Sequence, residues 1–244
     1  ALGRRTSAVN TGAAFAEEGF NRYSYNDRSE LVAVDRFPGT DPTAPRDPVV
    51  DQHRAYEYDP IGNRKESTGW DMAGNAQERV FYETNGLNQY EGLKKDGVTQ
   101  TPSYDADGNM NALGGTAYTW NAENRLTAVE PQVPEAGSRK VTFLYDYLGR
   151  RIQTQVFTHN GESWNQQPVE SRRFVYDGWN LIQESLDTNH LKTDRYFIWG
   201  LDLSQSLQGA GGIGGLLCAV NGESADYYAY DANGNVGQLV DAQT

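Results

Sequence analysis

Apolar and polar residues alternate along most of this chain, which is the pattern of half-buried β-strands. Aromatic residues recur in pairs two positions apart, as in Tyr56 and Tyr58, and such residues share one face of a strand. Further alternating stretches, such as 151–157, place Ile, Val and Thr where a pleated surface favours them. Residues 11–20 are the best helical stretch, but glycine breaks it twice and we interpret it as loop or a single turn. The pattern predicts an all-β fold.

A short unit recurs along the chain and consists of an aromatic residue, Asp, two variable residues, Gly, and then Asn or Arg. Looser copies begin at Tyr25, Trp120 and Tyr176, and residues 2–5 duplicate 148–151, so we expect the chain to begin within a copy. The unit is matched five times, by Tyr58, Asp59 and Gly62; Trp70, Asp71 and Gly74; Tyr104, Asp105 and Gly108; Tyr145, Asp146 and Gly149; and Tyr230, Asp231 and Gly234.

Each copy is typical of a β-hairpin turn. The Asp side chain can accept a hydrogen bond from the backbone two residues on, and the Gly supplies the positive φ that closes a type I turn with a bulge. We therefore expect consecutive antiparallel hairpins in a curved sheet. Because the ring recurs with the turn, we expect it to be structural, and to stack on the ring of the next hairpin. The expected anchors are Tyr25, Tyr58, Trp70, Tyr104, Trp120, Tyr145, Tyr176 and Tyr230.

Two proline-rich stretches, 38–50 and 131–138, interrupt the hairpins and are expected to be surface connections, because Pro cannot donate to a strand ladder. Neither shifts the composition enough to mark a domain boundary. The sequence thus predicts a single repeat array over residues 1–244.

Composition narrows the class of protein. The mean hydropathy of −0.72 alone would suggest disorder, but 15 Tyr and 5 Trp favour a folded chain with a Tyr-rich interior. A net charge of −12 excludes a protein that binds nucleic acid by neutralising phosphates, and no apolar run is long enough to span a membrane. Cys218 is the one cysteine, so no internal disulfide can form.

Motifs for chemistry are weak. Residues 209–214 satisfy G-x-G-x-x-G, but a strand pattern and not a helix follows, so we interpret them as a flexible loop. The Asp-rich turns resemble fragments of calcium loops without their full register. His53, His159 and His190 are scattered, and no Gly-x-Ser-x-Gly nucleophile elbow occurs. The sequence nominates no catalytic residue, no metal ligand and no cofactor.

The repeated Tyr-Asp-x-x-Gly-Asn/Arg unit resembles the YD repeats of the Rhs (rearrangement hot spot) family, relatives of Tc toxin C-component and teneurin shells. The resemblance covers nearly the whole chain and is most specific at 195–203, 209–217 and 228–236. In that family the repeats wind a β-sheet spirally into a hollow cocoon around a C-terminal domain, which is often toxic. Residues 59–63 superficially match the family's Asp-Pro-x-Gly-Leu self-cleavage motif, but Asn63 replaces the Leu and the residues fit the hairpin unit.

The resemblance implies a non-catalytic length of shell wall, with the remainder of the parent polypeptide and its enclosed domain as partners, secreted or displayed on a bacterial cell surface. Open sheet edges would also allow self-association. The alternative is a glycan-binding or cell-surface adhesion module that uses the aromatic surface. A third class, an enzyme, would require a pocket with converging titratable groups.

Overall fold

The computed structural model describes residues 3–13 and 15–242 as antiparallel β-strands joined by turns and longer connections, with one 3-10 turn, η1 (Val50–Gln52). Leu2, at the start of the expected first copy, lies outside the described residues. The all-β class and the consecutive antiparallel hairpins are confirmed. The chain divides into an N-terminal unit, Ala1–Gly114, and a C-terminal unit, Gly115–Thr244. The single array over residues 1–244 stays a prediction.

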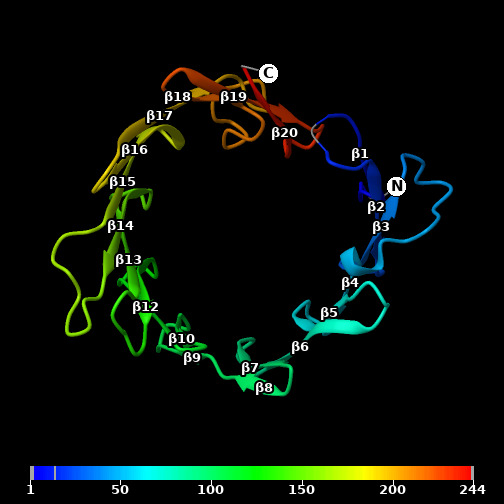
Figure 1. The fold of residues 1–244 in the computed structure, drawn as a ribbon, viewed down its shortest axis with the longest axis horizontal. Helices are drawn as coiled ribbons and strands as arrows, with labels where there is room; N and C mark the ends of the chain where they lie inside the picture. Colours follow the sequence, from blue (N-terminus) through cyan, green and yellow to red (C-terminus); the bar gives the residue numbers. More distant parts are fainter. Residues whose placement is uncertain (1–2, 14, 243–244) are drawn as a thin grey trace. The chain divides into compact units, whose positions relative to one another are not determined.

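The N-terminal unit holds an eight-stranded sheet in which each strand pairs with its neighbour in the sequence (Figure 1). A further antiparallel pair, β9 (Ser103–Tyr104) and β10 (Met110–Leu113), follows it. The sheet consists of β1 (Ser7–Asn10), β2 (Gly19–Tyr25), β3 (Leu31–Pro38), β4 (Arg54–Tyr58), β5 (Arg64–Trp70), β6 (Ala76–Thr84), β7 (Tyr90–Lys95) and β8 (Val98–Gln100).

The C-terminal unit continues the same order, each strand pairing antiparallel with the next. Its strands are β11 (Thr116–Trp120), β12 (Leu126–Pro131), β13 (Arg139–Tyr145), β14 (Arg151–Thr158), β15 (Glu170–Asp177), β16 (Asn180–Thr188), β17 (Lys192–Trp199), β18 (Leu216–Asn221), β19 (Ser224–Tyr230) and β20 (Val236–Asp241). No helix among the described residues is long and apolar enough to cross a membrane.

Sequential antiparallel pairing gives each unit two different edges. At one, which we call the turn edge, lie the reversals 26–30, 59–63, 85–89 and 105–109 of the N-terminal unit, and 121–125, 146–150, 178–179, 200–215 and 231–235 of the C-terminal unit. At the other, the connection edge, lie 39–53, 71–75 and 96–97 of the N-terminal unit, and 132–138, 159–169, 189–191 and 222–223 of the C-terminal unit.

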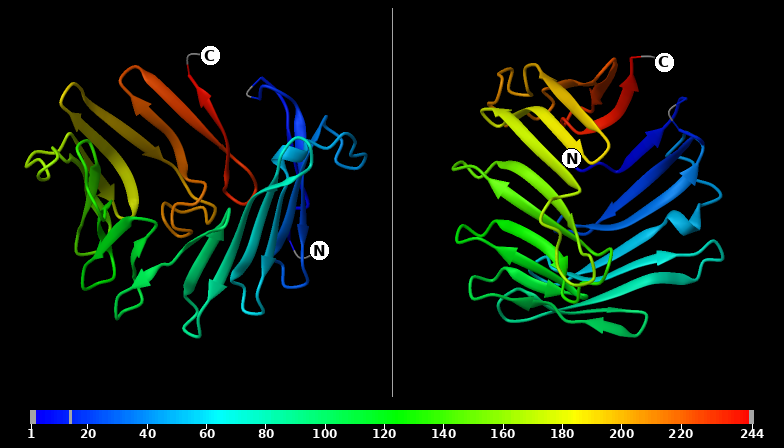
Figure 2. Two further views of the ribbon diagram at one scale, coloured as in Figure 1. Left: turned by 60° about the horizontal axis from the view of Figure 1, so that its bottom comes forward. Right: turned by 60° about the vertical axis from the view of Figure 1, so that its left-hand side comes forward.

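The proline-rich stretches lie at the connection edge. Residues 39–53 join β3 to β4 and extend away from the strands, as the blue loop in the left view of Figure 2 shows. Residues 132–138 join β12 to β13. The sequence did not indicate the connection 159–169, which contains a single Pro.

Few apolar side chains are buried. Among the described residues these are Phe20, Cys218 and Ala219; the Phe20 ring stacks on Phe37 at 5.3 Å between centroids. The repeat tyrosines are half-buried, and the residues beside them on the same strands are mostly exposed. The sheet therefore depends largely on strand pairing and on contacts made at its edges.

Gly108 tests the turn geometry, because its φ of 84° lies in the left-handed region that L side chains rarely adopt. We expect Gly108→Val to lower the free energy of unfolding by about 2 kcal/mol, since a β-branched residue is strained there. Gly108→Asn is the matched control, because Asn occupies the equivalent positive-φ position at Asn88 and Asn124. It should cost about half as much. Equal losses in chemical denaturation would contradict the assignment.

Candidate functional site

The turns are built on an Asp or Asn side chain. In turn 59–63, Asp59 Oδ1 accepts hydrogen bonds from the backbone N–H groups of Ile61 (3.0 Å) and Asn63 (2.8 Å). The backbone adds a bond from Asp59 N–H to Asn63 O (2.8 Å) and one from Gly62 N–H to Asp59 O (3.2 Å). The same side-chain bonds recur at Asn26, Asn85, Asp105, Asn121, Asp146 and Asp231.

The third residue after the Asp or Asn has a positive φ. Glycine supplies it at Gly62, Gly74, Gly108, Gly149 and Gly234, where φ lies between 78° and 97°. In the looser copies the same place is taken by Ser29, Asn88 and Asn124. Asn tolerates this conformation better than most residues, which explains how the copies with Asn88 and Asn124 keep the turn without the glycine.

These bonds also stabilise the ionised carboxyl groups. The side-chain amide of Asn75 holds the pKa of Asp71 below its usual value, and the amide of Asn109 does the same for the pKa of Asp105. The carboxylate oxygens in the turns accept bonds from the chain's own amides, as those of Asp59 and Asp105 do. Among the described residues, no three His, Cys, Asp or Glu side chains are grouped as metal ligands would be.

Repeat aromatic residues bind the backbone of the preceding hairpin. The Tyr145 hydroxyl donates to Leu126 O (2.8 Å), and the Tyr58 hydroxyl donates to Leu31 O (2.9 Å). In each case the acceptor lies at the start of the neighbouring strand. The equivalent bonds run from Tyr25 to Arg5 O, Tyr104 to Tyr90 O, Tyr176 to Arg151 O, Trp199 to Leu181 O and Tyr230 to Leu216 O, at 2.6–3.0 Å. We call these bonds the tethers.

The tethers lie where the backbone ladder between hairpins has ended. Between β12 and β13 the paired residues are Ala128 with Thr142 and Val129 with Val141, so Leu126 is past the last pair. Its carbonyl would otherwise depend on water. The tyrosine hydroxyl extends the connection between two hairpins by one bond at the turn edge.

Ring stacking between successive hairpins was the wrong expectation for these tyrosines. Guanidinium groups of the preceding hairpin lie over the rings: Arg150 over Tyr176 at 5.2 Å, and Arg4 over Tyr25 at 5.3 Å. The physical reason is distance, because equivalent positions of successive hairpins are two strands apart, roughly 10 Å. The ring therefore lies over the intervening strand.

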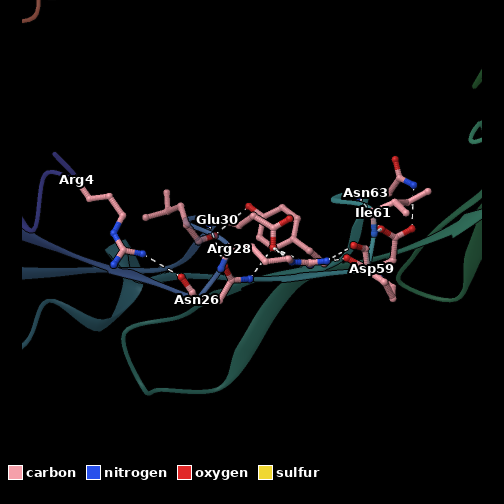
Figure 3. Close-up of polar contacts among 10 residues, drawn as sticks. Arg4, Asn26, Arg28, Glu30, Asp59, Ile61 and Asn63 are labelled. Carbon is pink, nitrogen blue, oxygen red and sulfur yellow. Dashed lines mark hydrogen bonds and ion pairs between the residues drawn. The ribbon is translucent and has the colours of Figure 1, made fainter. Parts of the chain in front are cut away.

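Side chains also link one turn to the next. Arg4 Nη1 donates to Asn26 O (3.0 Å), and Arg28 Nη2 donates to Asp59 O (2.5 Å), as Figure 3 shows. In the C-terminal unit, Arg150 donates to Gly178 O. Arg4 and Arg150, which close their copies of the repeat unit, thus contact the neighbouring copy, and Arg28 does so from a variable position of its copy.

The sequence-based anchors do not all share this geometry. Trp70 precedes the turn 71–75, which joins β5 to β6 at the connection edge, so its copy marks a tight reversal on the opposite side from turn 59–63. Trp120 pairs in register with Leu126 at the turn edge. The anchoring role of both stays a prediction.

Sequence reasoning missed Trp199 and Asp202. The Trp199 indole N–H makes the tether to Leu181 O at 2.7 Å, although no Asp follows it directly. The pair Phe197 and Trp199, two residues apart, was the available signal.

The Asp202 carboxylate organises the glycine-rich loop 200–215. It is 2% exposed and accepts bonds from the Ser204 hydroxyl (2.6 Å), Ala210 N–H (2.6 Å) and Gly212 N–H (3.2 Å). The Ser204 hydroxyl and these amides lower the pKa of Asp202 to about 2, against the opposing effect of burial. The amides that a dinucleotide phosphate would need are thus occupied by the chain's own carboxylate.

A cavity of about 490 Å³ lies over β14–β17. Its titratable lining residues are Arg173, Asp187, Lys192 and Asp194, and Lys192 Nζ lies 3.0 Å from Asp187 Oδ2. An ion pair between two lining residues is a structural contact and supplies no nucleophile with its base.

No model of a protein family matches the chain. The "tRNA3(Ser)-specific nuclease WapA" of Bacillus spizizenii is 30% identical over 191 residues, 77% of this chain and 7% of the relative. The "Double-stranded DNA deaminase toxin A" of Burkholderia cenocepacia is 30% identical over 156 residues, 54% of this chain and 10% of the relative. Among solved structures, that of TcdB2-TccC3 matches 98% of this chain and 14% of its own, with 12% identity and a TM-score of 0.55. The chain resembles Rhs-type YD-repeat segments in its repeat unit and TcdB2-TccC3 in its fold.

The chain spans a tenth or less of the length of these two curated relatives. Their names assign toxic or nuclease activities to much longer polypeptides. The likeness to TcdB2-TccC3 shows a shared fold.

Tyr145→Phe tests the tethers. Removing the hydroxyl leaves Leu126 O without this donor and should lower the free energy of unfolding by about 1 kcal/mol. Tyr147→Phe, two residues away in the same turn region, is the control, because Tyr147 is 88% exposed. It should change stability by less than about 0.5 kcal/mol. Similar effects of the two substitutions in urea denaturation would contradict the tether.

Acid titration tests the Asp202 contacts. Because the folded carboxyl is the stronger acid, its contribution to stability is complete above the ordinary pKa of 3.8 and is lost as the pH falls toward about 2. Asp202→Asn should lower the melting temperature at neutral pH and reduce its further fall between those two pH values. Asp107→Asn, at an exposed turn position, is the control. An unchanged acid profile in the Asp202 variant would contradict this role.

Proposed function

We propose that this segment is a length of shell wall that encloses or presents a C-terminal domain of its parent polypeptide, and that it takes no part in catalysis. The tethers carry the proposal. Each joins one hairpin to the hairpin before it, so that a wall of any length could be built by adding copies. A binding or catalytic site has no need of the same bond at seven separate positions.

The charged side chains support a structural role. Asp59 and Asp202 accept bonds from backbone amides of their own loops, and Arg150 binds the next turn. Groups held in this way are poorly suited to proton transfer, because their partners are fixed. We propose that nuclease or deaminase activity, as named for the relatives, belongs to another part of a parent protein.

The partners that we propose are the remainder of the parent chain and its C-terminal domain. In the N-terminal unit all three residues of β8 are exposed, and in the C-terminal unit all six residues of β20 are exposed. β8 ends the eight-stranded sheet, and such strands can pair with further strands of the parent or with a second copy. By resemblance to the relatives, we propose that the parent is a bacterial protein exported to the cell surface or the medium.

The glycan-binding alternative is less well supported. Sugar stacking needs open ring faces, but guanidinium groups lie over repeat rings such as Tyr25 and Tyr176. No contact among the described residues favours this alternative over the wall.

Limited proteolysis of the parent polypeptide tests the proposal. The C-terminal domain should be cleaved more slowly within the parent than when it is produced alone. A parent with Tyr145→Phe, Tyr176→Phe and Tyr230→Phe should lose part of this protection, because three tethers are removed. Tyr147→Phe should retain it. Equal cleavage of the domain inside and outside the intact parent would contradict enclosure.

A further inference from the structure

A cavity of about 300 Å³ lies on the face of the N-terminal unit that carries the repeat tyrosines. It is formed over β4, β5, β6 and β7, and its lining includes Tyr56, Ser67 and Val80. Ser67, Val80 and Lys95 pair in register across β5, β6 and β7, so the three share one face of the sheet. The cavity is therefore shaped by consecutive strands and not by a loop.

The charge of this cavity is opposite to that of the chain. Three of its lining residues, Arg54, Arg64 and Lys95, are cationic, and Glu78 is the acidic one. Glu78 lies 3.7 Å from Arg54, whose Nη1 also donates to Asp51 O and His53 O. Arg54 is thus engaged by the protein, whereas the charges of Arg64 and Lys95 face the cavity without a carboxylate within ion-pair distance among the described residues.

Arg64 is held in place by aromatic residues. Its guanidinium lies 4.7 Å from the Tyr56 ring centroid. Burial lowers the pKa of Arg64, but the hydroxyls of Tyr82 and Tyr58 outweigh this effect and hold the pKa above its usual value. Its Nε is buried and has no hydrogen-bond partner among the described residues. A buried guanidinium N–H without an acceptor is costly, so the protein does not satisfy all the donors of this side chain.

Ser67 provides a neutral donor. Its hydroxyl lies 3.3 Å from the Tyr82 hydroxyl, and when Tyr82 donates, the Ser67 proton is available to another acceptor. Two cations and a hydroxyl are the groups that recognise phosphate and carboxylate oxygens in proteins.

We propose that this cavity binds a small oxyanion, a phosphate or carboxylate group, through Arg64, Lys95 and Ser67. The site is independent of the wall proposal, since it would bind its ligand whether or not the segment encloses a domain. Lys95 is exposed and Arg64 is half-buried, and the anion enters from the tyrosine-bearing face.

Isothermal titration of the 244-residue chain with inorganic phosphate, and separately with glutarate, at low ionic strength tests the site. Lys95→Gln should weaken binding by about tenfold, the effect of losing one charge-assisted hydrogen bond. Lys94→Gln is the matched control, because neighbouring residues of a strand point to opposite faces and Lys94 does not line the cavity. Arg64→Gln should weaken binding at least as much, and Arg64→Lys should restore part of it.

If Arg64→Gln fails to fold, the pair Lys95→Gln and Lys94→Gln decides the question alone, since both lysines are exposed. Binding of phosphate only would identify a phosphate group as the ligand, and binding of both anions would extend the site to carboxylates. Either result supports the proposal if Lys95→Gln weakens the binding and Lys94→Gln does not. Equal weakening by the two lysine variants, or no binding of either anion, would overturn the proposal.

Discussion

The bond from a repeat aromatic residue to the backbone of the preceding hairpin is the contact on which the architecture depends. The sheets bury few apolar side chains, and the backbone ladder between hairpins ends before the turn edge, as between β12 and β13. Beyond the last backbone pair, the Tyr145 hydroxyl makes the hydrogen bond between the two hairpins. The energy of each such bond is modest, about 1 kcal/mol, but the bond recurs at seven positions among the described residues.

The repeat unit can now be understood position by position. The aromatic residue binds the hairpin before it, Asp folds the turn, Gly allows the positive φ, and Arg or Asn contacts the next copy, as Arg150 contacts Gly178. Each position thus has a different partner. This explains why the looser copies still form the turn. Asn121 provides the side-chain acceptor in place of the Asp, and Asn124 adopts the positive φ in place of the Gly.

Much of this fold is predictable from local sequence, because turns and alternating strands are local structures. The hairpin at Asp105 and Gly108 is an example. The partner of Tyr145 is not predictable in this way, because Leu126 lies 19 residues earlier and its carbonyl becomes available only through strand register. Local sequence did not indicate Asp202 for the same reason, because its amide partners lie on a loop of irregular shape. The oxyanion cavity likewise depends on Lys95 and Ser67 meeting across three strands.

Amide hydrogen exchange in a chain carrying Tyr145→Phe, Tyr176→Phe and Tyr230→Phe tests this account most directly. The account predicts faster exchange at the turn edge of the hairpins on both sides of each lost tether, with protection at the connection edge preserved. Exchange that is unchanged at the turn edge, or that rises uniformly along the strands, would show that the hydroxyls do not couple the hairpins.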